Sequence, residues 1–257
     1  RAAEVAAAGM HNFLMIGPSG SGKTMIARRI PGILPSLSLE ECLELTRIYS
    51  VAGLLPEKQA LLTERPFRAP HHTTTAEALA GGGKIPKPGQ ISLSSGGILF
   101  LDELPEFRRT ALEILRQPLE EQKVCISRTA GTYTFPADFM LVAAMNPCRC
   151  GNFGLPGQEC SRAPKCAEEY RARISGPLLD RIDLHIEVEP VNFDQLSDER
   201  RGEPSSAIRA RVVRARQTQQ RRFADRPGIT CNAQMDPRSL DEFCRLDDRS
   251  RALLKTA

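Results

Sequence analysis

The sequence has no tryptophan and only three tyrosines among its 257 residues, and aromatic side chains make up 5% of it. Few side chains are therefore suited to stacking on the bases of a single-stranded nucleic acid. No stretch approaches the ~18 consecutive apolar residues of a membrane helix, and no cleavable export signal is visible. We therefore expect no membrane-spanning helix and a cytoplasmic location.

Disulfides are not expected either, because a cytoplasmic protein keeps its thiols reduced. Four of the eight cysteines nevertheless crowd into one glycine- and proline-rich segment, as Cys148, Cys150, Cys160 and Cys166. Four thiolates are able to surround one structural Zn²⁺ tetrahedrally. The C-x-C and C-x5-C spacings differ from the usual C-x2-C pair, so loose surface thiols remain the alternative interpretation.

Charge is modest overall, at +4, but nine arginines lie between residues 200 and 226 against only Glu203 and Asp225. Such a run is typical of a solvated helix face, and nucleic-acid binding is the other interpretation. Ile208, Val212 and Ala215 recur at helical spacing within this stretch. We therefore expect a helix with one buried face, and we do not count its arginines as a DNA site.

Along the chain, expected strands alternate with expected helices, which predicts an α/β fold with a central parallel sheet. The expected strands cover residues 12–16, 98–101, 139–145 and 184–188, and a β-hairpin covers 124–135. Helices are expected at 23–30, at 107–116 and after Ser38, where Glu41 completes a capping box; Thr74 and Glu77 are expected to cap a short one. The composition turns polar near residue 192, so 1–191 is interpreted as a three-layer core and 192–257 as the start of a helical lid.

The segment that follows the first expected strand matches G-x-x-x-x-G-K-[ST] at every fixed position. It consists of Gly17, Pro18, Ser19, Gly20, Ser21, Gly22, Lys23 and Thr24. Glycines let successive backbone N–H groups turn toward phosphates, and the following helix adds partial positive charge. We expect Lys23 to reach the β- and γ-phosphates of ATP and Thr24 to ligate Mg²⁺.

Two further expected strands end in polar residues suited to hydrolysis. Asp102 and Glu103 follow the buried strand 98–101, and Asn146 follows the strand 139–145. At the carboxyl edge of a parallel sheet, where ligands bind, Asp102 is expected to hold Mg²⁺ through water. Glu103 is expected to activate the attacking water as general base, and Asn146 to sense the γ-phosphate. For Asn146, the start of a turn before Pro147 is the alternative.

Together these residues resemble one family. The segments GPSGSGKT, RPFRAPHHTTT, PGQISLSSGGILFLDELPEF, MNPC and RISGPLLDRIDLHIEV are similar to those of magnesium-chelatase-related AAA+ ATPases, in particular the YifB/ComM subfamily. The resemblance covers nearly the whole chain. It implies a P-loop AAA+ core in a homo-oligomeric, hexameric ring that hydrolyses ATP to drive branch migration of DNA in natural transformation.

The resemblance also implies roles for basic residues. Arg181, just before the last expected strand, would act in a neighbouring subunit's site as an arginine finger; Arg173 is a competing candidate, and a structural salt bridge is the alternative for both. Arg128 near the hairpin tip would touch DNA phosphate in the ring pore, with Lys84 and Lys87 as second candidates. A solvent-facing turn residue is the alternative for Arg128.

The family pattern also concerns the ends of the chain, which opens with Arg1 rather than methionine inside a helix-favouring run. We expect a piece of a longer protein, lacking an N-terminal Lon-protease-like domain and with its lid cut short. A further sensor arginine would lie beyond residue 257.

Two questions stay open at this stage. His71 and His72 are adjacent, so in an extended chain they would point in opposite directions, which is poor geometry for one metal ion; the PHHTTT run is interpreted as an element that responds to nucleotide or partner. The work that ATP drives has two interpretations: movement of branched or single-stranded DNA, or remodelling of a protein partner without DNA contact.

Overall fold

A computed structural model describes residues 1–57, 59–129, 131–154, 160–190 and 202–256. Its centre is a five-stranded sheet in the order β2-β5-β8-β1-β9, and every neighbouring pair is parallel. The strands are β1 (Phe13–Ile16), β2 (Phe67–Arg68), β5 (Ile98–Leu101), β8 (Met140–Met145) and β9 (Leu184–Glu187). The predicted central parallel sheet is confirmed.

The sheet is buried on both faces because its central strands are apolar at every position. Successive side chains point to opposite faces, so Leu99 and Leu141 enter one hydrophobic cluster while Ile98 and Val142 enter another. The two clusters lie on opposite faces of the sheet, and each is closed by helices. This arrangement gives the three layers expected of the core.

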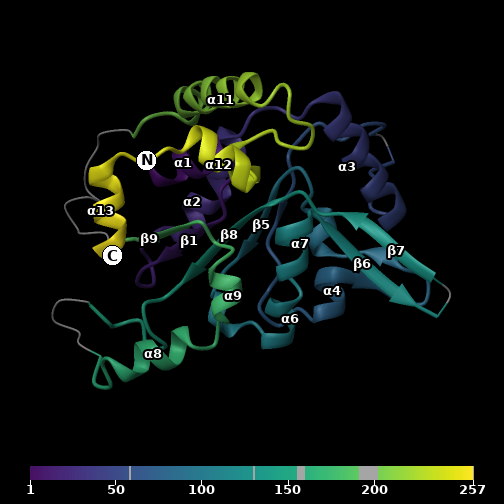
Figure 1. Ribbon diagram of the computed structural model, residues 1–257. Coiled ribbons are helices and arrows are strands. Elements are labelled where there is room, and N and C mark those ends of the chain that lie inside the picture. The colour runs from purple at the N-terminus through teal and green to yellow at the C-terminus, as the bar shows by residue number, and fades with distance from the viewer. Residues whose placement is uncertain (58, 130, 155–159, 191–201, 257) are drawn as a thin grey trace.

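One face is covered by the N-terminal helices together with a helix from the C-terminal part of the chain (Figure 1). These are α1 (Ala2–Gly9), α2 (Lys23–Arg29), the 3-10 turn η1 (Ile30–Ile33) and α11 (Ser205–Arg222). The helix α11 contacts α1 and η1 through Val212, which is fully buried, as its helical spacing predicts. Helices of the middle of the chain cover the other face: α4 (Ala76–Ala80), α5 (Gln90–Leu93), α6 (Arg109–Glu113), α7 (Arg116–Glu121), α8 (Lys165–Arg171) and α9 (Gly176–Leu179).

Two antiparallel hairpins lie outside the central sheet. One pairs β3 (Gly81–Gly82) with β4 (Lys87–Pro88), and the longer one pairs β6 (Lys123–Arg128) with β7 (Gly131–Pro136). The β6–β7 hairpin extends away from the layered core in Figure 1. Its presence confirms the hairpin predicted at residues 124–135.

Helix α3 (Leu39–Ala52) begins where the sequence predicts. Ser38 Oγ accepts a hydrogen bond from the backbone N–H of Glu41, and Glu41 Oε2 accepts one from the backbone N–H of Ser38. This reciprocal pair satisfies two donors at the helix start. Gly53 adopts a left-handed conformation (φ 75°) at the other end, as in many helix C-terminal caps.

Three local predictions were wrong. The helix expected at 107–116 follows a 3-10 turn η2 (Leu104–Glu106) and is divided into α6 and α7, because Pro118 has no N–H to bond the carbonyl of Ile114. Helix α4 is capped by Thr75 rather than Thr74, since the Thr75 hydroxyl accepts from Ala78 N–H. The rings of His71 and His72 do not diverge; their centroids lie 4.0 Å apart because the chain turns there.

After α11 the described chain forms η3 (Asn232–Gln234), α12 (Pro237–Phe243) and α13 (Asp248–Thr256). Arg211 of α11 pairs with Glu4 of α1 and with Glu203, so part of the arginine-rich run is neutralised within the chain. None of the helices that the structure describes has the length and apolar character needed to cross a bilayer.

Candidate functional site

The glycine-rich loop connects β1 to α2 at the carboxyl edge of the sheet. Gly22, the residue before α2, has φ of 85°, a conformation that glycine adopts without strain. A Cβ on Gly17 would lie 2.3 Å from the carbonyl oxygen of Val188, so only glycine fits there. The loop therefore leaves the amino end of α2 open, the arrangement that binds phosphate in P-loop proteins.

Lys23, the first residue of α2, turns its side chain back over this loop. Its Nζ donates hydrogen bonds to the carbonyl oxygens of Gly17 and Pro18, both at 2.7 Å, and to Ser21 Oγ at 3.3 Å. Burial lowers the pKa of Lys23, and the nearby charge of Asp102 opposes that shift. The ammonium group is thus held at the loop, where it can exchange carbonyl contacts for phosphate oxygens.

Thr24 and Asp102 come together from distant parts of the chain. The Thr24 hydroxyl donates a 2.7 Å hydrogen bond to Asp102 Oδ2, because β5 and α2 both approach the same edge of the sheet. Hydroxyl and carboxylate oxygens are hard donors of the kind that Mg²⁺ prefers. The pair therefore fits a magnesium site next to the phosphate loop.

Glu103 and Asn146 line the same cavity as the loop. This cavity of about 350 Å³ is bounded by residues 19–25, Asp102, Glu103, Met145 and Asn146. Glu103 has a left-handed backbone conformation (φ 53°), which is uncommon for a residue with a Cβ and is often found at functional sites. The structure thus brings the expected base and the expected sensor to one cavity with Lys23 and Thr24.

A residue that the sequence reasoning did not assign to catalysis also lies here. His72 Nδ1 is 3.5 Å from Glu103 Oε2. The adjacent strands β2 and β5 end side by side, so the turn after β2 meets the residue after Asp102. His72 was not assigned from the sequence because the sequence alone does not give the order of strands in the sheet.

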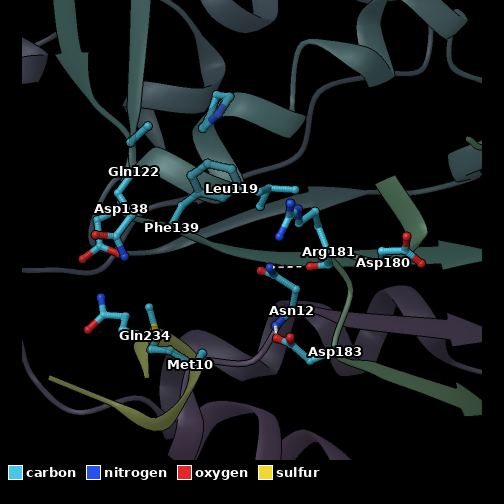
Figure 2. Close-up of a pocket in the computed structure, with 13 residues that line it drawn as sticks. Met10, Asn12, Leu119, Gln122, Asp138, Phe139, Asp180, Arg181, Asp183 and Gln234 are labelled. Atoms are coloured by element: carbon cyan, nitrogen blue, oxygen red, sulfur yellow. Dashed lines mark hydrogen bonds between the residues drawn. The ribbon is translucent and has the colours of Figure 1, made fainter. Parts of the chain in front are cut away.

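The two arginine candidates lie at opposite edges of the sheet. Arg173 is close to the phosphate-loop side, where it forms a 2.8 Å ion pair with Glu106, three residues after Glu103. Arg181 lies at the amino edge, where its carbonyl accepts a hydrogen bond from the Asn12 side chain (Figure 2). Its guanidinium pairs with Glu120 at 2.5 Å. Arg181 is therefore not part of the cavity that its own chain forms around Lys23.

The four clustered cysteines converge in the structure. Their sulfur atoms all lie within 4.8 Å of one another, and Cys148, Cys160 and Cys166 are buried. Tetrahedral zinc with Zn–S bonds of about 2.3 Å requires sulfur separations of about 3.8 Å, so the cluster fits with small adjustments. A backbone hydrogen bond from Cys150 lowers the pKa of Cys166, which favours the thiolate that a metal binds.

The three basic residues expected at the pore lie on the two hairpins. Arg128 ends β6, Lys87 begins β4, and Lys84 lies in the β3–β4 turn. A Cβ built on Gly82 would be 3.2 Å from a guanidinium nitrogen of Arg128, so Arg128 lies beside the β3–β4 hairpin that carries Lys84 and Lys87. The Lys87 amine itself lies near Gly53, at the end of α3.

Comparison with known proteins gives consistent matches along the chain. Residues 1–196 match the family described as magnesium chelatase, subunit ChlI, and residues 202–257 match its C-terminal family. Competence protein ComM of Haemophilus influenzae is 43% identical over 260 residues, covering 100% of this chain and 49% of the relative. An uncharacterized protein YifB of Salmonella typhimurium is 44% identical, covering 96% of this chain and 47% of its own length. An uncharacterized protein of Mycobacterium bovis, Mb2921c, is 43% identical and covers 100% of the chain. The chain spans about half the length of these relatives.

Proposed function

Since this chain belongs to the magnesium chelatase ChlI family of AAA+ ATPases, we propose that it is the ATP-hydrolysing core of a ring-shaped motor that moves DNA. The observation that carries the proposal is the cavity in which the phosphate loop, Asp102, Glu103 and Asn146 meet. We also propose a cytoplasmic location for the protein.

Each residue of the cavity has a chemical task in this proposal. Lys23 and the backbone N–H groups of residues 17–24 bind the phosphates of ATP. Thr24 and, through water, Asp102 hold Mg²⁺, which would neutralise charge on the phosphates when bound. Glu103 accepts a proton from the attacking water, and the Asn146 amide orients that water without adding charge.

The ring supplies one further residue to each site. Arg181 lies at the amino edge of the sheet, away from its own chain's cavity, so it is the candidate that faces a neighbouring subunit. In a hexamer, Arg181 would release Glu120 and stabilise the negative charge that develops during hydrolysis in the neighbouring subunit's site. Arg173, held by Glu106 beside its own Glu103, is less suited to acting in trans.

DNA is the proposed substrate of the motion because of the basic residues on the two hairpins. Arg128, Lys84 and Lys87 present positive charge without an aromatic stacking platform, which suits contact with phosphates rather than bases. The relative named competence protein ComM agrees with a role in handling DNA.

Remodelling of a protein partner is the second candidate, and one residue favours it. Ile85, next to Lys84 in the β3–β4 turn, is 78% exposed. An exposed apolar side chain in this turn is suited to contacting the apolar side chains of an unfolded polypeptide. DNA remains the first candidate because Lys84 and Lys87, the residues near Ile85, are positively charged.

Zinc is proposed as a structural ion of the cysteine cluster. Cys148 lies two residues after Asn146, and Cys166 lies on α8, so one ion would tie the end of β8 to that helix. Thiolate coordination stabilises a segment that has little core of its own.

The experiment that tests the motor proposal is steady-state ATPase of the full-length protein, with and without a four-way DNA junction. We expect the junction to stimulate hydrolysis and Glu103→Gln to abolish it, with ATP binding retained. ATPase that depends on Glu103 but ignores DNA would contradict the DNA motor and favour the protein-remodelling candidate. Hydrolysis that persists in Glu103→Gln would contradict the assignment of the base.

A further inference from the structure

Glu103 lines two adjoining cavities, which share Thr24 and Asp102, and Lys23 lines the first of them. The second, of about 260 Å³, is bounded by Thr24, Arg28, residues 69–72, Phe100, Asp102 and Glu103. Among the described residues, His72 is the one that forms an ion pair with the Glu103 carboxylate. Glu103 therefore lines the cavity of the phosphate loop and also contacts an imidazole.

The position of His72 is determined by the fold around it. Strand β2 pairs with β5 in parallel register, Arg68 opposite Leu99, so the chain leaving β2 passes the chain leaving β5. The His72 ring lies between His71, at 4.0 Å between centroids, and Phe107, whose edge-on ring is at 6.5 Å. His71 is fixed in turn by a 2.9 Å contact between its Nδ1 and Thr73 Oγ1. The imidazole is thus held by packing, whereas the side chain of Glu103 is half exposed.

We propose that His72 is a positioning residue for hydrolysis: its Nδ1 fixes the carboxylate of Glu103 in the orientation that accepts a proton from the attacking water. A base that is itself oriented by a third group is a recurring arrangement in enzymes. The separation of 3.5 Å is long for a hydrogen bond, and such contacts commonly shorten once substrate is bound.

The geometry separates this role from the binding of phosphates by Lys23. His72 lines the cavity that also includes Thr24 and Asp102 but not the cavity that contains Lys23, and no hydrogen bond or ion pair joins it to Lys23 in the described structure. Loss of the His72 side chain should therefore slow the chemical step without weakening the binding of the ATP phosphates. The inference rests on the proposed role of Glu103 as general base.

The test is steady-state and single-turnover ATPase of the full-length protein with His72→Ala. We expect kcat to fall about tenfold while KM and the Kd for ATP stay within twofold of wild type. His71→Ala is the comparison variant: His71 packs on the His72 ring but forms no ion pair or hydrogen bond with Glu103 in the described structure, so its loss should lower kcat less than the loss of His72. His72→Asn should recover part of kcat, since its amide nitrogen stands where Nδ1 stands, whereas His72→Leu should not.

A double variant distinguishes positioning from general damage. In Glu103→Gln, where the base is absent, adding His72→Ala should lower the residual rate no further. The proposal is overturned if kcat of His72→Ala is unchanged or raised, if KM rises in proportion, if His72→Asn is no better than His72→Leu, or if the losses add in the double variant. If Glu103→Gln abolishes the ATPase activity but His72→Ala leaves it intact, this proposal alone is overturned. ATPase unaffected by Glu103→Gln overturns the proposed function as well.

Discussion

The amine of Lys23 is buried against the loop from which it projects, and it contacts two carbonyl oxygens. Burial lowers its pKa because a charged ammonium loses water contacts, while Asp102 favours the charged form. A carbonyl carries only a partial negative charge, so phosphate oxygens are stronger acceptors for the same donor. Lys23 is therefore positioned to bind an anion such as phosphate.

Replacing Lys23 should consequently weaken nucleotide binding. We expect Lys23→Ala to raise the Kd for a fluorescent ATP analogue by about 10- to 100-fold, equivalent to about 1.4–2.8 kcal/mol. Lys165→Ala serves as the control, because Lys165 is exposed and lies on α8. Equal affinity of the Lys23→Ala protein and the wild type would contradict a phosphate-binding role.

At the scale of elements, the packing of α11 on α1 combines an apolar contact with an ion-pair network. Val212 is buried beneath the interface, and Arg211 bridges Glu4 of α1 and Glu203. A hydrogen bond from Arg211 lowers the pKa of Glu4 below its ordinary 4.5, and Arg211 does the same for Glu203. The network links α1, near the start of the chain, to α11.

These lowered pKa values give the interface a pH dependence. A carboxyl group with a depressed pKa in the folded state contributes stability above the unfolded pKa, and this stability is lost as pH falls below 4.5 through the folded value. We expect Arg211→Gln to lower the thermal midpoint at pH 7 and to show a smaller further loss between pH 5 and pH 3 than wild type. Circular dichroism measures both. Parallel curves for the two proteins would show that the network does not contribute.

The cysteine cluster lies between the end of β8 and α8, and the zinc that we propose there can be measured directly. We expect about one zinc per chain by elemental analysis of the purified protein, and loss of most of it in Cys166→Ser. Cys125→Ser, at an exposed cysteine outside the cluster, should keep the metal. Removing zinc with a chelator should lower the thermal midpoint of the wild type. Absence of metal from wild type, with the chelator having no effect, would favour loose thiols.

For the whole molecule, two hairpins that are distant in sequence lie side by side, with Arg128 of one next to Gly82 of the other. Each phosphate contact on single-stranded DNA contributes about 0.7 to the slope of log K against log salt concentration. We expect the combined replacement of Arg128, Lys84 and Lys87 by alanine to reduce that slope by about 2. Fluorescence anisotropy across a salt series measures it.

Lys123→Ala provides the control for that series, because Lys123 begins the same hairpin strand but pairs with Glu121. Its slope should match that of the wild type. An unchanged slope in the triple variant would contradict a DNA contact at the hairpin tips, whatever the effect on ATPase.

The sequence by itself determined the parts of this protein that depend on neighbouring residues. The apolar runs of β1, β5 and β8 must be buried strands, and the glycines and Lys23 of the phosphate loop act through consecutive backbone groups. The capping box at Ser38 is local for the same reason. Fine boundaries such as the cap at Thr75 escaped prediction because three successive threonines offer the same chemistry.

The tertiary structure decided what depends on residues that are far apart in the chain. The parallel register of β2 and β5 puts His72 beside Glu103, and packing of two hairpins brings Arg128 to Gly82. The edge at which each arginine lies likewise follows from the sheet and the helices around it, and so does the convergence of four sulfurs from separate positions in the sequence. Strand order and the packing of loops are set by the burial of the whole core, which no local pattern specifies.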